Sequence, residues 1–207
     1  MSPYVVKYMR HSIIAFLFFV FAFVGCGNPD SEKNESPQAT DASLNDIPAT
    51  ALREKFADNP DMENVIINDA QGVLSAQGTL LNGKKEGTWT EFNSNGTVKT
   101  IMPYVLGKRE GIYVELNSSG QFIKRISYHN NLRHGRYIEY IYPVKKEERT
   151  YQEGKLEGSV KIYYPDGKIM EEGSYNNDTR DGISRWYDNA GKVTIEYEYK
   201  HGELVKK

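Results

Sequence analysis

Three histidines in the second half of the chain are the first candidates for acid–base or metal chemistry. His129, His134 and His201 lie near a recurring turn, at positions where other copies of that turn carry Asn, Lys or Arg. Histidines that interchange with such residues are typical of solvated turns, so we expect no catalytic or ligating role for them. The segment Tyr164–Lys168, which holds Gly167, is interpreted as a turn that does not precede a helix, unlike a phosphate-binding loop.

Glu91, Glu115 and Glu139 recur in one column of the sequence and suggest a paired-carboxylate site. If each repeat contributes two strands, equivalent positions lie two strands apart, or about 9 to 10 Å. That separation is too large for two carboxylates to share a proton or a metal ion, and the column continues as Ile162 and Trp186. We therefore expect solvated charges here, with no catalytic residue, no metal site and no cofactor.

Cys26 is the single cysteine of the 207-residue chain, which excludes an internal disulfide and a multi-cysteine metal site. Lys7 and Arg10 precede an apolar run over residues 13–24, as in a secretory signal. Twelve residues rise only about 18 Å as a helix, too little to cross about 30 Å of hydrocarbon. Residues 1–25 are therefore interpreted as a signal peptide and not as a transmembrane span.

The segment Phe23–Cys26 resembles the bacterial lipobox, with small Gly25 before the cysteine and Phe23 where leucine is usual. The resemblance implies acylation of Cys26 and a lasting anchor in a membrane of the cell envelope. Gly27 stands where aspartate would resemble an inner-membrane retention signal, so the outer membrane or cell surface is favoured. An ordinary secretory leader that ends in cysteine is the alternative.

Residues 26–62 are predicted to be the lipidated cysteine and a flexible tether. Ser, Asn, Asp, Glu and Pro dominate up to about Asn45, which leaves too little apolar surface to offset the entropy of ordering. Pro48, following Asn45 and Asp46, favours a short helix over residues 48–57. Leu52 and Phe56 would share one face of that helix and could dock on the next domain. A linker with a transient turn is the alternative.

From residue 63 to residue 207 the sequence repeats with a period of about 24 residues. Every glycine from Gly72 onward falls into one of four columns of this period, and Asn131 or Asp178 stands where a column lacks glycine. Asn and Asp tolerate a left-handed backbone best among other residues. Each period holds two strand-like segments and two turns. The predicted turn glycines are Gly83, Gly87, Gly96, Gly107, Gly111, Gly120, Gly135, Gly154, Gly158, Gly167, Gly182, Gly191 and Gly202.

Large side chains also recur in columns, which predicts how the hairpins hold together. One column is Tyr104, Tyr128, Tyr151, Tyr175 and Tyr199; others are Phe92, Leu116, Tyr140, Tyr163 and Tyr187, and Val98, Phe122, Ile169 and Val193. Each column would become a ladder across the sheet. We predict an all-β fold, an elongated single antiparallel sheet of about five to six stacked β-hairpins. The third repeat is shorter, and Pro143 predicts a changed turn or a bulge there.

The unit Tyr-x-x-Gly-x-x-x-Gly-x-aromatic followed by a turn glycine resembles the MORN repeat variant. Tyr104–Gly111 with Tyr113 and Gly120 carries the resemblance, and Tyr151–Gly158 with Gly167 carries it again. The resemblance covers about residues 63–207 and implies one twisted sheet of hairpins. Bacterial members are often labelled as antitoxin-like proteins.

Function is expected to be non-enzymatic, because no pocket with a converging acid and base is indicated. The net charge of −2 argues against nucleic acid, and no small-molecule substrate is expected. The leading hypothesis is a membrane-anchored lipoprotein that presents its sheet to a protein partner. One alternative is an antitoxin or immunity protein against an envelope-acting toxin. Another is glycan or cell-wall binding through the aromatic strip Trp89, Tyr113 and Tyr137, although packing inside the sheet is the favoured role of these rings.

Overall fold

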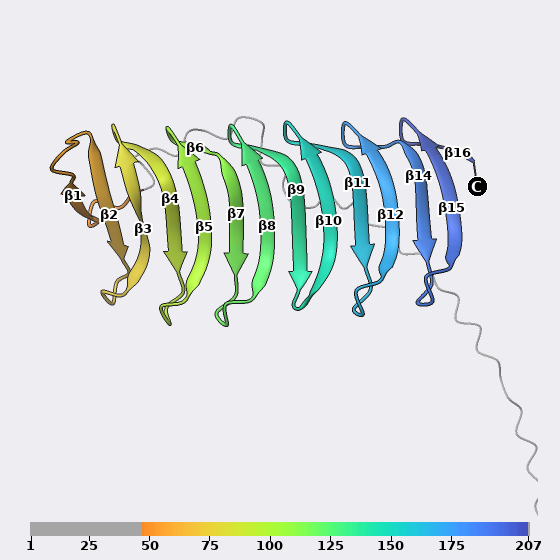
Figure 1. Ribbon diagram of the computed structural model, residues 1–207, viewed down its shortest axis with the longest axis horizontal. Helices are drawn as coiled ribbons and strands as arrows, with labels where there is room; N and C mark the ends of the chain where they lie inside the picture. The colour runs from red at the N-terminus through yellow and green to blue at the C-terminus, as the bar shows by residue number, and fades with distance from the viewer. Residues whose placement is uncertain (1–46, 207) are drawn as a thin grey trace, which may run out of the picture. The chain divides into compact units, whose positions relative to one another are not determined.

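The computed structural model describes residues 47–206, and all of its regular elements are strands of one antiparallel sheet (Figure 1). Within that range no helix is present that could cross a bilayer. The leader, Cys26 and most of the predicted tether lie outside the described residues. In chain order the strands are β1 Leu52–Lys55, β2 Met62–Asn68, β3 Leu74–Leu81, β4 Lys84–Phe92, β5 Val98–Val105, β6 Lys108–Arg109, β7 Gly111–Leu116, β8 Phe122–His129, β9 Leu132–Ile141, β10 Val144–Gln152, β11 Lys155–Tyr163, β12 Ile169–Asn176, β13 Thr179–Arg180, β14 Gly182–Tyr187, β15 Val193–Lys200 and β16 Glu203–Lys206.

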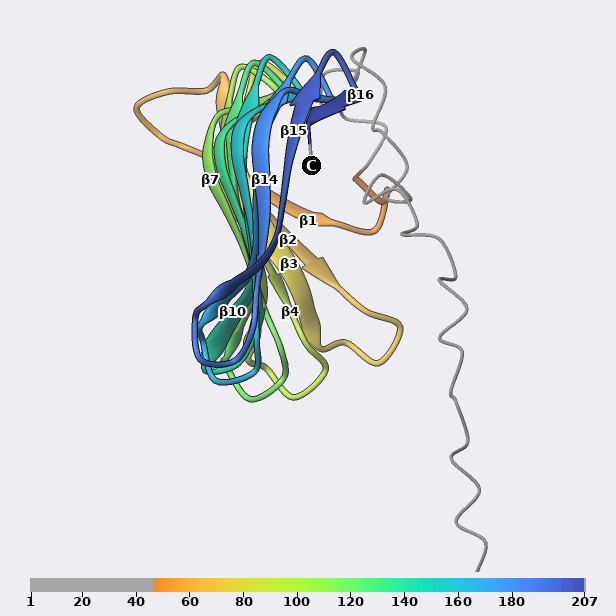
Figure 2. The same cartoon turned by 90° about the vertical axis from the view of Figure 1, so that its right-hand side faces the viewer.

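Strand order in the sheet follows chain order, as expected for hairpins laid side by side. β6 and β7 form one interrupted strand, and so do β13 and β14, since each pair faces the same neighbour. Figure 2 views the row of strands end-on and shows the hairpins lying one behind another with a similar bend. The prediction of a single sheet of stacked hairpins is confirmed.

Two kinds of turn alternate along the chain. The upper turns of Figure 1 have a positive φ at both central residues, as in type I′ hairpin turns, and these residues are Asn82–Gly83, Leu106–Gly107, Asn130–Asn131, Glu153–Gly154, Asn177–Asp178 and His201–Gly202. Most lower turns open with Asn or Asp and close on a glycine with positive φ, as at Asn93 and Gly96. Tyr142 and Pro143 instead form a two-residue lower turn, with a bulge at Lys145–Glu147, so the expected irregularity is present.

One group of predicted turn glycines lies inside the strands. Gly87, Gly111, Gly135, Gly158 and Gly182 begin or interrupt the first strand of each repeat. Opposite each of them the pairing register jumps: Gln77 pairs with Thr90, and Thr79 pairs with Glu86. Three residues thus face one, and the positive φ of the glycine accommodates the surplus. The spacing identified the backbone requirement, but its origin is a bulge and not a turn.

The helix predicted over residues 48–57 is wrong. Residues 52–55 form strand β1, which pairs with β2 from Leu52↔Ile66 to Lys55↔Glu63. Leu52 and Phe56 are exposed, while Ile47 is buried against Val65 and Trp89. The backbone of β2 offers hydrogen bonds to these residues along its whole edge, and this tertiary pairing outweighs a weak local helical preference.

The two clusters of buried hydrophobic residues lie on one face of the sheet, here called the inner face, whereas buried Ile138 lies on the other face. Tyr104, Tyr128, Tyr151, Tyr175 and Tyr199 form the predicted ladder there, and a basic side chain from the preceding or following first strand lies over most of these rings: Lys85 over Tyr104, Arg109 over Tyr128, Arg133 over Tyr151, and Arg180 over Tyr175 and Tyr199. Each such contact contributes on the order of 0.5–2 kcal/mol. The core is one side chain thick, and Lys and Arg side chains therefore cover its tyrosine rings.

Candidate functional site: the two faces of the sheet

The aromatic strip is part of the inner core and offers little ring surface to a ligand. Trp89 is 5% exposed and Tyr137 is 1% exposed. The Trp89 ring lies against Gly78, and its Nε1 donates to the Thr79 carbonyl at 2.9 Å. Tyr113 is half-buried, and burial raises the pKa of its hydroxyl. Trp89 packs with Ile47 and Ala51, whereas Tyr113 and Tyr137 pack in the central cluster with Ile126 and Tyr128.

The glutamate column also lies on the inner face and is separated as predicted. Thr100 stands between Glu91 and Glu115, and Lys124 stands between Glu115 and Glu139. Burial raises the pKa of Glu139, but the hydrogen bond and charge of Lys146, at 2.7 Å, together with the Tyr137 hydroxyl and the charge of Lys124, lower it by more, so the net shift is downward. Among the described residues no three His, Cys, Asp or Glu side chains are placed to hold a metal ion.

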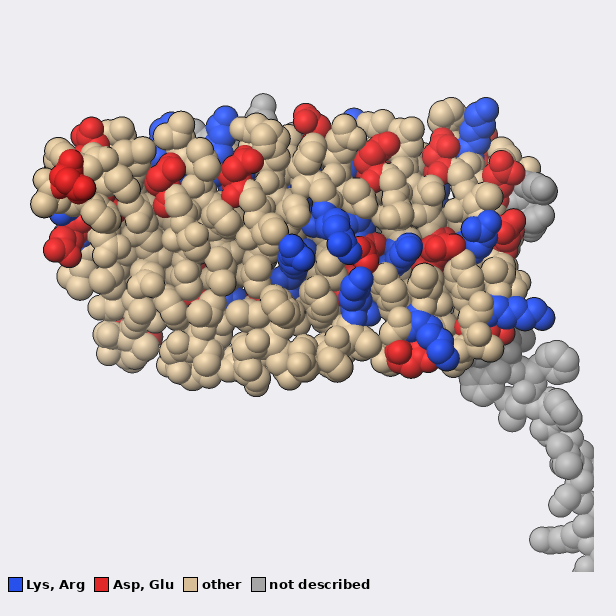
Figure 3. Space-filling model, in the orientation of Figure 1, with Lys and Arg blue, Asp and Glu red and all other residues tan. Residues whose placement is uncertain are grey.

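The opposite, outer face carries a neutral half and a charged half. Cross-strand partners form one row across it, in the order Ile66, Gln77, Thr90, Ile101, Val114, Arg125, Ile138, Glu148, Lys161, Glu172, Arg185 and Glu196. Figure 3 shows charged side chains gathered over the central and last strands, whereas the area below the upper turns is uncharged over the first strands.

We call the neutral half the apolar plate and define it by Phe92, Ile101, Ile112, Val114, Leu116 and Phe122. These residues come from β4, β5, β7 and β8, and Phe122 is 45% exposed. No element within residues 47–206 packs over them, because the sheet there is a single layer. Monomeric proteins rarely expose a contiguous apolar area of this kind without a function.

The charged half is internally paired. Glu148 accepts hydrogen bonds from Arg136 and from Lys145, and Arg185 binds Glu196 at 2.7 Å and approaches Glu172 at 3.5 Å. Burial raises the pKa of Glu148, but the two cations lower it below its ordinary value. Because these side chains form ion pairs with one another, the charged half does not need an oppositely charged partner for charge neutralisation.

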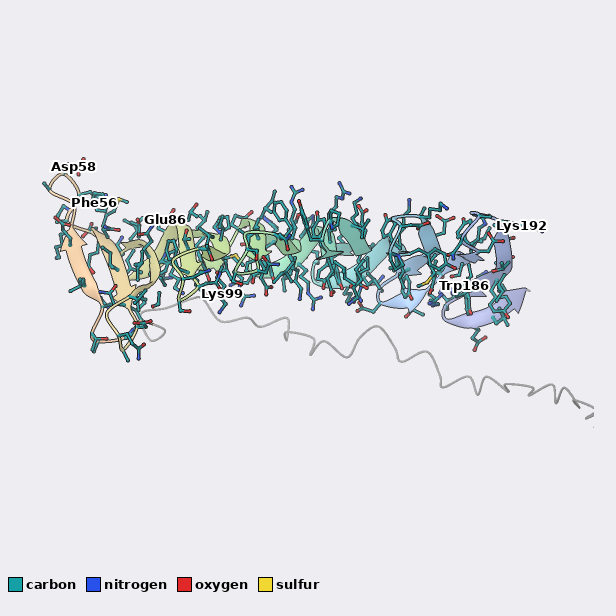
Figure 4. The ribbon with its side chains drawn as sticks, turned by 90° about the horizontal axis from the view of Figure 1, so that it is seen from below. Phe56, Asp58, Glu86, Lys99, Trp186 and Lys192 are labelled. Atoms are coloured by element: carbon teal, nitrogen blue, oxygen red, sulfur yellow. The ribbon has the colours of Figure 1, made fainter. Side chains whose placement is uncertain are left out.

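A second column of acidic residues, which was not singled out from the sequence, joins consecutive repeats at the upper turns. Each carboxylate accepts a hydrogen bond from the backbone N–H of the next upper turn: Glu86 from Leu106, Glu110 from Asn130, Glu157 from Asn177 and Asp181 from His201. We call this set the carboxylate column. Figure 4 shows Glu86 on the side of the ribbon opposite to Lys99 and Trp186. In the sequence the column is visible as an acid that directly precedes four of the five bulge glycines, Gly87, Gly111, Gly158 and Gly182.

The histidines lie at the upper turns, as predicted. His129 Nδ1 is 2.9 Å from Glu110 Oε1, and His201 Nδ1 is 3.3 Å from Asp181 Oδ2. His134 occupies the position of the carboxylate column in the third repeat, where its Nδ1 accepts from the Glu153 N–H at 3.4 Å.

The comparisons agree with this architecture. Three of its segments match the MORN repeat variant. They are residues 85–105, 156–177 and 180–201, each a strand pair with its lower turn. The hairpin of β7 and β8 has the same kind of lower turn as these segments, and that of β9 and β10 has a different one; the match extends to neither. No curated protein matches the chain.

Solved structures with some similarity are large and distant. The GtfA/B complex has 12% identity and a TM-score of 0.29, covering 54% of this chain and 20% of that chain. A mutant of TarM from S. aureus, in complex with fondaparinux, alpha-GlcNAc-glycerol and UDP, has 14% identity and a TM-score of 0.26, covering 69% and 21%. The chain thus spans about a fifth of the length of these proteins.

Proposed function

We propose that the protein is a non-catalytic repeat protein whose sheet binds a protein partner through the apolar plate. The observation that carries this proposal is an apolar area, bordered by exposed Arg125, on a face that no described element covers. Aromatic and Arg side chains, such as exposed Phe122 and Arg125 here, are enriched among the residues that dominate protein–protein binding. An antitoxin would be one case of this function, with an envelope-acting toxin as the partner.

A matched pair of residues tests the plate. Ile112 and Ile183 occupy the same column on the outer face, are 39% and 41% exposed, and lie in the neutral and the charged half respectively. A photo-cross-linking amino acid placed at position 112 of the full chain in the producing cell should give a discrete protein adduct, and a second substitution in the plate, Phe122→Lys, should abolish it. The same amino acid at Ile183 should give none. Equal adducts at both positions, or none at Ile112, would overturn the proposal.

We further propose that Cys26 is acylated and anchors the sheet in the cell envelope. The support is the lipobox-like segment that ends in the single cysteine of the chain. An alkyne-bearing fatty acid supplied to the cells should label the full chain, and Cys26→Ser should abolish the label. Labelling that persists in the variant would contradict the anchor without affecting the plate, because the two proposals depend on different parts of the chain.

A further inference from the structure

The junction between the third and fourth repeats differs chemically from the others. Where the other upper turns after the first are held by a carboxylate, the turn at Glu153 is held by the imidazole of His134. A carboxylate keeps its acceptor oxygens until the solution is strongly acidic, since it titrates near pH 4. An imidazole nitrogen accepts only while it is unprotonated, and histidine titrates between pH 5 and 8.

The turn that His134 holds also has an unfavourable residue, Glu153, at its first central position. Glu153 has φ 53°, in the left-handed region that favours Gly, Asn and Asp, whereas the corresponding turns before and after it begin with Asn130 and Asn177. The cost of such a conformation is of order 1 kcal/mol or more and must be met by surrounding contacts. The His134 acceptor is one of those contacts.

When the His134 ring is protonated, the groups around it provide no other acceptor for the Glu153 N–H. Its ring centroid lies 5.7 Å from that of His129 on β8, so two imidazolium ions would repel each other. Glu110 is the nearby acid, but its oxygens already bind His129 and the Asn130 N–H. On the same strand, Arg133 lies over Tyr151 and Arg136 binds Glu148. The remaining acid is Glu153, whose own backbone N–H is the donor.

We propose that His134 is a pH-sensitive link between the third and fourth repeats, and that its protonation releases the upper turn at Glu153. The released Nδ1 becomes a donor that faces another donor, so the turn opens locally while the neighbouring turns stay closed. Mildly acidic surroundings would therefore loosen the sheet at one junction in its middle. The inference does not depend on the proposed partner or on the lipid anchor.

Hydrogen exchange of the full chain, measured at pH 7.5 and pH 5.5 and corrected for intrinsic rates, tests this link. Protection of the Glu153 amide should fall about two- to ten-fold on acidification, the range expected for one hydrogen bond. The Asn177 amide, which Glu157 holds, is the internal control and should not change. His134→Glu restores the carboxylate column and should remove the fall.

His129→Asn separates the two histidines. The proposal requires that this variant keep the acid-induced fall at Glu153, since His134 is still present. A fall of equal size at Glu153 and Asn177 would overturn the proposal. So would a fall that persists in His134→Glu or disappears in His129→Asn.

Discussion

At the scale of single residues, the thin core depends on a glycine where its largest side chain lies across the sheet. Trp89 lies across Gly78, and the backbone of Gly78 leaves no room for even a methyl group, because a Cβ there would be 2.3 Å from the ring. At the same column of a later repeat, Gly173 faces Ser184, whose Oγ would be 2.9 Å from an added Cβ. The two glycines share a column of the sequence but have different neighbours.

Gly78→Ala should therefore cost about 2–3 kcal/mol of unfolding free energy, the range for overpacking a core. Gly173→Ala should cost less, about 1 kcal/mol, because it meets a serine hydroxyl instead of an indole ring. Urea denaturation of both variants measures the difference. Equal losses would show that Trp89 does not lie against Gly78.

The carboxylate column makes stability depend on pH. The N–H of Asn130 and the side chain of His129 hold the pKa of Glu110 below its ordinary value. Its contribution is therefore fully present above the unfolded value of about 4.5 and is lost as pH falls through the lower native pKa. Glu110→Gln keeps an acceptor without the charge, so it should be less stable than wild type, by roughly 1 kcal/mol or less, at pH 7.

Thermal or urea unfolding of Glu110→Gln and wild type between pH 7 and pH 3 measures this contribution. The gap should persist down to about pH 4.5 and close below it, as Glu110 takes up a proton. A gap that widens below about pH 4.5 would have the wrong sign for this contact.

At the scale of elements, the sequence predicted the hairpins well because their turns impose strict backbone requirements. Asn131 and Asp178 replace glycine in the upper turns, and both have a positive φ. Their side chains also accept from the N–H groups of Arg109 and Leu156, which lie on β6 and β11, the first strands of the preceding hairpins, a benefit that glycine could not provide. The spacing of the columns therefore predicts where the turns lie, but it does not predict the hydrogen bonds that join one repeat to the next.

Two features could not be read from the sequence for physical reasons. Strand β1 depends on the free edge of β2 and on burial of Ile47, and no local pattern reports such tertiary contacts. The assignment of side chains to faces fails at the lower bulges, where alternation is interrupted. Lys99 follows outer Val98 at such a bulge and lies on the same side as Trp186 (Figure 4). The residues of the apolar plate therefore cannot be assigned to one face without the pairing register.

Leu106 offers a test of the upper turns, because it occupies the first central position with φ 50° and is exposed. Leu106→Asn should stabilise the protein by about 0.5–1 kcal/mol, since Asn tolerates this conformation better than Leu. The reciprocal change Asn82→Leu, in the equivalent turn, should destabilise it by a similar amount. Chemical denaturation of both variants checks the sign; a loss of stability in Leu106→Asn would contradict the turn geometry.

At the scale of the described sheet, function follows from having one face committed to packing and another left open. The inner face uses its tyrosines and cations to close a thin core, and the last strands of the outer face pair their charges with each other. What remains is the apolar plate over β4, β5, β7 and β8. Repeat sheets commonly act through such extended surfaces, which supports a binding role.

Distances between repeats test the central claim most directly. Spin labels at Asn95, Asp166 and Ala190, in a Cys26→Ser background, report three lower turns of the row. With strands about 4.8 Å apart and two strands per repeat, the Asn95–Asp166 distance should be about 29 Å and the Asn95–Ala190 distance about 38 Å. Distances that grow by about one repeat in this way would establish an open row of hairpins. Two equal distances, or a shorter one to Ala190, would show a closed globule and contradict it.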